Sequence, residues 1–154
     1  MPGKVESKVT EIDPHITDDQ QTNVAALRSM VEHFVSERDW QQFHSPKNLS
    51  MAMSIEAAEL MEQFQWITTD ESRVPDEERL ANVTEELADV LCYALAIANE
   101  LDIDVASAMK NKMVKNRKKY PVQTYRGFYG KDDANLKLQS DSGAEKPAET
   151  GDDP

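Results

Sequence analysis

With 154 residues, of which 39% are hydrophobic, the chain is long enough for one folded domain with a core of its own. Its net charge of −12 argues against a nucleic-acid partner, because binding to a phosphate backbone requires a basic excess. No apolar run approaches the ~20 residues of a membrane span, and the N-terminus lacks a signal-type apolar core. We therefore expect no membrane association. The single cysteine, Cys92, falls in an apolar helical pattern, so we expect a buried thiol and a reducing cytoplasmic compartment.

The chain begins with a polar stretch, residues 1–17, which has two prolines and no helical periodicity and is predicted to be a flexible arm. A first helix is predicted from Asp18 or Asp19, as N-cap, to about Arg38. Its inner face consists of Val24, Leu27, Met30, Val31 and Phe34. The connector at 37–45 is dense in aromatic and hydrogen-bonding side chains. It either binds a ligand or only caps the end of a helix bundle with Trp40 and Phe43.

A second helix is predicted from Pro46 to Trp66, with Ser45 as its N-cap. Steps of three and four residues place on one face Leu49, Ala52, Met53, Glu56, Leu60 and Gln63. Glu56 therefore lies within an apolar stripe, and Glu59 lies one turn on at its edge. A carboxylate that faces a core is costly unless a cation or a hydrogen-bond donor meets it.

A third helix follows the polar loop at 68–75 and begins at Asp76 with an acidic first turn, which the helix dipole favours. Its apolar stripe consists of Val83, Glu86, Leu87, Val90, Ala94, Ile97 and Leu101. Asp89 and Tyr93 lie beside this stripe. Glu86 and Asp89 thus repeat, three residues apart, the pattern of acids on a buried helix face.

A fourth helix is predicted from the N-cap Asp104 to Pro121. One face consists of Val105, Met109, Lys112, Met113, Asn116 and Tyr120, so a lysine and an asparagine share the predicted inner face. Residues 131–154 form a polar, acidic tail that we expect to be disordered. The sequence therefore predicts an all-α domain at 18–130 with four main helices.

The four acids on inner helix faces indicate a metal site. Facing carboxylates cannot all stay ionised without cations, and oxygen ligands with open positions suit Mg²⁺ or Mn²⁺. A ferritin-like di-iron site would need a Glu-x-x-His motif, which the three histidines do not supply. The alternative is a solvated acidic face, which we assign instead to Glu62 and Glu85.

The pattern Glu56-x-x-Glu59 followed by Glu86-x-x-Asp89 resembles the metal motif of the all-α, MazG-type nucleoside triphosphate pyrophosphohydrolases. The flanking residues are similar to the dCTP pyrophosphatase branch of that family. They include Glu37-Arg38-Asp39-Trp40-Gln41-Gln42-Phe43-His44, Pro46, Asn48-Leu49, Phe64-Gln65-Trp66, Glu86-Leu87-Ala88-Asp89-Val90-Leu91-x-Tyr93 and Lys112-Met113-x-x-Asn116-Arg117-x-x-Tyr120-Pro121. The match runs in order from about Leu27 to Pro121.

The resemblance implies hydrolysis of a nucleoside triphosphate, dCTP or modified dCTP in this branch, to the monophosphate and pyrophosphate. It implies that Mg²⁺ is bound by Glu56, Glu59, Glu86 and Asp89, one of which can also serve as general base. It places around the nucleoside Trp40, Gln41, Gln42, Phe43, His44, Trp66 and Tyr93, and at the phosphates Lys112 and Asn116. It also implies a homotetramer built as a dimer of dimers, in which subunits can share the base-binding aromatic residues.

The chain departs from vertebrate relatives at Val31, where they carry a histidine, and at Gly127-Phe128-Tyr129-Gly130. Both departures concern base preference and leave the family resemblance intact. Three classes of function therefore compete. They are a triphosphate pyrophosphohydrolase, either dCTP-selective or broad in a house-cleaning role; a dUTPase-like or phosphoribosyl-ATP-hydrolysing relative; and a non-catalytic acidic helical adapter.

Overall fold

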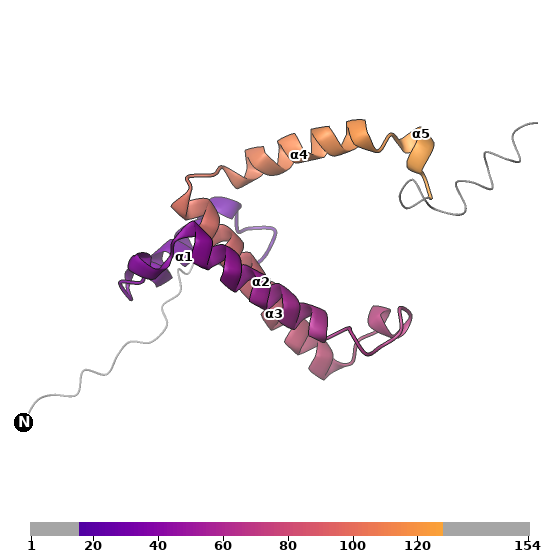
Figure 1. Ribbon diagram of the computed structural model, residues 1–154, viewed down its shortest axis with the longest axis horizontal. Coiled ribbons are helices and arrows are strands. Elements are labelled where there is room, and N and C mark those ends of the chain that lie inside the picture. The colour runs from indigo at the N-terminus through magenta and orange to yellow at the C-terminus, as the bar shows by residue number, and fades with distance from the viewer. Residues whose placement is uncertain (1–15, 128–154) are drawn as a thin grey trace, which may run out of the picture. The chain divides into compact units, whose positions relative to one another are not determined.

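The computed structural model describes residues 16–127, and these residues form helices and connecting segments without a strand. The four main helices are α1 (Val24–Ser36), α2 (Pro46–Glu62), α3 (Glu77–Glu100) and α4 (Val105–Lys119), followed by the short α5 (Val122–Tyr125) (Figure 1). Two 3₁₀ turns, Gln41–Phe43 and Glu71–Arg73, lie in the connections before and after α2. The predicted all-α class with four main helices is confirmed.

Local hydrogen bonds explain where most helices begin. The side chains of Ser45, Asp76 and Asp104 each accept a hydrogen bond from the backbone N–H three residues on. Such caps satisfy backbone donors that have no partner inside the helix. These three predicted helix starts are confirmed.

The predicted start of the first helix was wrong. Asn23, not Asp18 or Asp19, is the N-cap of α1, and its side chain accepts a hydrogen bond from the N–H of Ala26. The Asp18 side chain instead accepts hydrogen bonds from the N–H groups of Gln20 and Gln21. Aspartate readily forms a local turn of this kind, which competes with helix formation.

The predicted end of the second helix was also wrong, because α2 ends at Glu62 rather than at Trp66. A tighter turn follows, in which the N–H of Phe64 donates to the carbonyl of Met61 at 3.0 Å. The guanidinium of Arg79, from the start of α3, donates to the carbonyl of Gln63. This carbonyl is thereby satisfied without a further helical turn.

The helices α2 and α3 run side by side in opposite directions, and α1 packs against α3 (Figure 1). The buried cluster contains Val31 of α1, Leu49 of α2 and Ala96 of α3, and Cys92 packs against it half-buried. Burial raises the pKa of the Cys92 thiol, and the charge of Asp89 raises it further. The raised pKa favours the neutral thiol, which is less reactive than the thiolate. Phe34, predicted to be buried, is exposed.

The helices α1 and α3 end in the same way, with an aspartate in the left-handed region: φ is 52° at Asp39 and 49° at Asp102. After each aspartate, the next N–H reaches back five residues. Trp40 N donates to the carbonyl of Val35 at 3.1 Å and Ile103 N to that of Ala98 at 2.9 Å. This is the hydrogen bond of the Schellman motif, and it fixes the direction in which Trp40 leaves α1.

The chain divides after Ala108 into two compact units. No helix among residues 16–127 is long and apolar enough to cross a membrane. The predicted arm, apart from residues 16 and 17, and the predicted tail lie outside the described residues, as does most of the Gly127–Gly130 segment. The limits of 18–130 for the folded domain stay a prediction.

Candidate functional site

Three of the four predicted metal ligands lie together. Glu56 of α2 and Glu86 and Asp89 of α3 each offer a carboxylate oxygen, and these oxygens lie within 4.8 Å of one another. Glu86 and Asp89 share a face of α3 because they are three residues apart. The packing of α2 against α3 then brings Glu56 opposite them.

Glu59, the fourth predicted ligand, is exposed and is not part of this group of three. Its charge nevertheless acts on the group, since after loss of solvent it is the largest cause that raises the pKa of Glu56 and of Glu86. It therefore lies at the rim of the cluster. Its role as a ligand stays a prediction.

The electrostatics of the cluster favour a cation. Loss of solvent raises the pKa of Glu56, and the charges of Glu59, Asp89 and Glu86 raise it further. Loss of solvent is also the main cause of the raised pKa of Glu86, followed by the charges of Glu59 and Asp89. Like charges that raise each other's pKa are neutralised by a bound cation. The donor set is entirely carboxylate oxygen, which fits a hard divalent ion.

Tyr93 lies one turn of α3 after Asp89, beside the carboxylates. Burial raises the pKa of its phenol, and the charges of Glu56 and Asp89 raise it further. A phenol held neutral in this position is a hydrogen-bond donor next to the acids. The prediction that Tyr93 contacts the nucleoside stays open.

The connector before α2 is held by its own contacts. The Trp40 ring lies edge-on to Phe34, with 5.9 Å between ring centroids, and 6.5 Å from the His44 ring. The side chain of Gln42 donates to the carbonyl of Asp39 at 3.0 Å, and that of Asn48 donates to the carbonyl of Phe43 at 3.0 Å. The aromatic residues of this connector are therefore displayed by a hydrogen-bonded turn.

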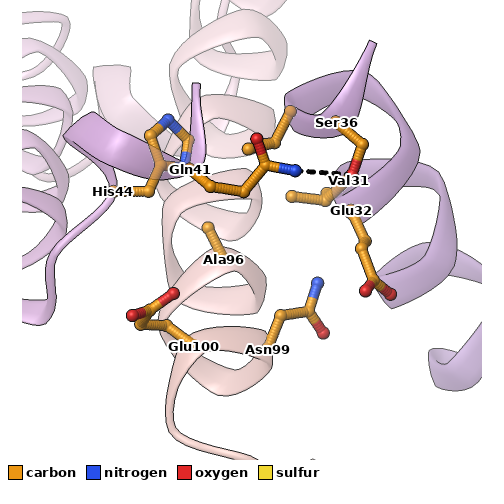
Figure 2. A pocket seen from close by; sticks show the side chains of 9 residues that line it. Val31, Glu32, Ser36, Gln41, His44, Ala96, Asn99 and Glu100 are labelled. Carbon is orange, nitrogen blue, oxygen red and sulfur yellow. Dashed lines mark hydrogen bonds between the residues drawn. The ribbon is translucent and has the colours of Figure 1, made fainter. Parts of the chain in front are cut away.

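A cavity of about 170 Å³ lies between the connector, α1 and α3 (Figure 2). Figure 2 shows Gln41 reaching across to α1, where its amide donates to the Ser36 hydroxyl at 2.9 Å. The cavity is lined by Val31, Glu32, Val35, Ser36, Gln41, His44, Ala96, Asn99 and Glu100. Gln41 and His44 were predicted to contact a nucleoside, and both line this cavity.

Of the remaining lining residues, the sequence analysis connected only Val31 with the base and missed the others. Ala96 lies seven residues after Asp89 on α3, which places the cavity ~10 Å along the helix from the carboxylates. Glu32 and Ser36 lie one turn apart on α1, a polar pair beside the apolar face. That spacing was the available signal, but nothing local shows that the pair borders a cavity.

Asn99 belongs to a hydrogen-bonded pair that joins α1 to α3. The Arg28 guanidinium donates to the Asn99 side-chain oxygen at 2.8 Å and to the carbonyl of Ala98 at 3.2 Å. In return the Asn99 amide donates to the carbonyl of Arg28 at 2.9 Å. The pair therefore holds the wall of the cavity in place and leaves the Asn99 amide oxygen already engaged.

The remaining predicted site residues lie on other segments of the chain. The Trp66 side chain is 88% exposed in the turn after α2, and Phe43 is exposed in the connector. Lys112 and Asn116 share a face of α4, which continues into the second compact unit. The predicted roles of these residues at the base and the phosphates are therefore untested.

The fold and the site define a class: an all-α protein with a carboxylate cluster between two antiparallel helices. Residues 51–128 match the model of the MazG-like family. The structure is similar to that of a pyrophosphatase from Archaeoglobus fulgidus, with a TM-score of 0.61 and 40% identity over 68% of this chain and 98% of that chain. The chain belongs to the MazG-like family.

Curated relatives narrow the comparison further. The chain is 43% identical over 104 residues to dCTP pyrophosphatase 1 of Mus musculus, a match that covers 66% of this chain and 61% of the relative. It is 42% identical over 103 residues to dCTP pyrophosphatase 1 of Homo sapiens, covering 65% of this chain and 60% of the relative. The chain thus matches three fifths of the length of these relatives.

Proposed function

We propose that this protein is a Mg²⁺-dependent nucleoside triphosphate pyrophosphohydrolase that converts dCTP to dCMP and pyrophosphate. The observation that carries the proposal is the cluster of Glu56, Glu86 and Asp89, whose oxygens lie within 4.8 Å of one another. Membership of the MazG-like family and similarity to proteins named dCTP pyrophosphatase 1 support it. Mn²⁺ would suit the same oxygen donors.

The carboxylates have two tasks in this proposal. Glu56, Glu86 and Asp89 would hold the metal ion, and Glu59 at the rim would be a further ligand or the general base that takes a proton from the attacking water. A bound Mg²⁺ supplies the positive charge that offsets the triphosphate and polarises the water. The phenol of Tyr93, kept neutral beside the acids, would donate a hydrogen bond to the substrate.

The cavity beside α1 is our proposed nucleoside site. It lies ~10 Å along α3 from the carboxylates, so the triphosphate would extend along the helix between the two. Gln41 and His44 line it, and Trp40 offers a ring beside His44 for stacking. Stacking is tolerant of every base, so preference for cytosine would come from hydrogen bonds made by polar lining residues.

The assembly we propose is a homotetramer built as a dimer of dimers. The α2 helix has 17 residues and is therefore ~25 Å long, with Trp40 before its start and Trp66 after its end. One base cannot contact both rings from a single chain unless the connector folds back. An exposed Trp66 is available to the base site of another subunit.

A broader triphosphate specificity is the second candidate. One observation favours it: Val31, at the position where vertebrate relatives carry a histidine, lines the proposed nucleoside cavity. An apolar side chain there cannot hydrogen-bond a base edge. A dUTPase-like preference would have the same origin.

One experiment separates these functions. Pyrophosphate release is measured for all common ribo- and deoxyribonucleoside triphosphates, with Mg²⁺ or with EDTA in excess. We expect release from dCTP above all others and none in EDTA. Comparable rates for several bases would favour the broad enzyme, and no release from any triphosphate would favour the adapter and contradict the proposal.

A further inference from the structure

The cavity beside α1 is lined by two carboxylates that come from different helices. They belong to Glu32 of α1 and Glu100 of α3, and Figure 2 shows them on two sides of the cavity. In the described part of the chain, the ion pairs are those of Glu37 with His33 and Arg38, so neither lining carboxylate is paired with a cation there. An ionised carboxylate accepts hydrogen bonds and cannot donate them.

The donors nearest to these acids are already engaged. The Arg28 guanidinium donates to the Asn99 side-chain oxygen at 2.8 Å and to the carbonyl of Ala98 at 3.2 Å. The amide of Gln41 donates to the Ser36 hydroxyl at 2.9 Å. Among the described residues, the lining therefore offers two charged acceptors and no lysine or arginine to match them. A ligand that fills the cavity is expected to bring hydrogen-bond donors of its own.

The ring edges of the bases differ in what they would present to these acids. Cytosine carries an amino group, which is a donor, where uracil and thymine carry a carbonyl oxygen, which is an acceptor. A glutamate can accept a hydrogen bond from the cytosine amino group, whereas a carbonyl oxygen beside the same carboxylate would place two acceptors together without a proton between them. The carboxylates also repel phosphate groups, so the base is the end of the substrate expected in this cavity.

We propose that Glu32 and Glu100 determine the base specificity of the site by accepting hydrogen bonds from the exocyclic amino group of cytosine. The amino group has two N–H donors, so both carboxylates can take part. The inference rests on the proposed function, because it places the base in the cavity beside α1. It assigns the discrimination against dUTP to two acids, and it needs no histidine at the position of Val31.

Turnover of a matched pair of substrates provides the first test. The values of kcat/KM for dCTP and dUTP are compared in wild type, Glu32→Gln, Glu100→Gln and the double variant, since glutamine keeps the shape of the side chain and removes its charge. We expect wild type to prefer dCTP by about tenfold or more, and the double variant to lose about fivefold or more of that preference. Glu78→Gln, at an exposed glutamate in the first turn of α3, is the matched control and should keep the wild-type ratio.

The direction of the change separates specificity from a structural role. In the double variant, kcat/KM should fall for dCTP and stay equal or rise for dUTP, because an amide can donate to the uracil carbonyl. Circular dichroism verifies the helix content of each variant. A wild type that prefers dUTP, an unchanged ratio in the double variant, or an equal loss for both substrates with helix content retained would overturn the proposal.

Binding of the nucleosides tests the same acids without catalysis. Saturation-transfer NMR compares deoxycytidine with deoxyuridine on wild type and on the double variant, and neither ligand carries a phosphate to hydrolyse. We expect wild type to favour deoxycytidine and the double variant to lose this preference. A wild type that selects deoxycytidine but hydrolyses no triphosphate would refute the proposed hydrolysis and uphold the role of the acids. Active hydrolysis of dCTP with equal binding of both nucleosides by wild type would do the reverse.

Discussion

Two parts of α3 have different surroundings. The C-terminal part, residues 92–100, holds the buried Ala96 and Ala98, and Arg28 of α1 is hydrogen-bonded to its Asn99. The N-terminal part, residues 77–91, bears Glu86 and Asp89 and exposes Leu80, Leu87 and Leu91. The C-terminal part is stabilised by contacts within the chain. The N-terminal part also has exposed surface for what the single chain does not contain, which in our account is a cation, a nucleotide and another copy.

Removing a carboxylate charge from the N-terminal part of α3 should have the largest effect on turnover. Glu86→Gln or Asp89→Asn removes a metal ligand while keeping the shape of the side chain, and we expect turnover to be abolished with helix content unchanged. Steady-state rates and circular dichroism check this. Glu85→Gln, on the exposed face beside the site, is the matched control and should change the rate less than twofold. A variant at Glu86 or Asp89 that keeps a tenth of the wild-type rate, a barrier change of about 1.4 kcal/mol, would refute the metal assignment.

Removing a contact of the C-terminal part of α3 should lower the stability of the fold. Arg28→Ala leaves the Asn99 side chain and the carbonyl of Ala98 without their partner, which should reduce the free energy of unfolding by about 1–3 kcal/mol. Chemical denaturation measures it, and Arg73→Ala, at an exposed arginine of the 3₁₀ turn Glu71–Arg73, is the control. Asn99→Ala should then cost less in the Arg28→Ala background than in wild type, because only the hydrogen bond from the Asn99 amide to the carbonyl of residue 28 remains to be lost. Additive effects of the two changes would show that the pair is not coupled.

Variants of the two tryptophans test whether another subunit contributes to the proposed base site. Trp40→Ala and Trp66→Ala should each raise the KM for dCTP, by the factor that corresponds to the ~1–3 kcal/mol of binding free energy that stacking on a base provides. Mixing the two variants should restore some activity if one pocket draws its indoles from different chains. Subunit exchange without recovery would place both rings in one chain.

The smallest loss of stability is expected at the start of α2, where a single side chain caps the helix. Ser45→Ala removes the cap on the N–H of Asn48 and should lower the free energy of unfolding by about 1 kcal/mol. Ser54→Ala, in the middle of α2, removes only a hydroxyl that donates to the carbonyl of Ser50, and is the control. Equal losses at both positions would indicate that the cap is not what fixes the helix start.

The features that the sequence could predict are those that depend on residues close together in the chain. Ser45 and Asp104 were identified as caps, and Asp76 as the start of an acidic first turn, because these residue types stand directly before a helical pattern. Glu56, Glu86 and Asp89 were identified because acids within an apolar stripe are visible from spacing alone. Both signals are local, and so both were available without a structure.

Contacts between distant segments were not predictable in this way. Arg28 and Asn99 are 71 residues apart, and neither stands out from its helical pattern. The hydrogen bond from Arg79 to the carbonyl of Gln63, which accompanies the early end of α2, also joins two elements. The cavity beside α1 exists only because three elements meet there. The sequence therefore predicted the main helices and the acids, but it missed most of the residues that line the cavity.

The central claim is divalent-dependent cleavage of the triphosphate into monophosphate and pyrophosphate, and phosphorus NMR of a dCTP reaction tests it most directly. With Mg²⁺ present, we expect the signals of dCMP and pyrophosphate to grow together from the first time point, and with EDTA we expect the dCTP signals to persist. Orthophosphate and dCDP as the first products, or unchanged turnover in EDTA, would contradict the account.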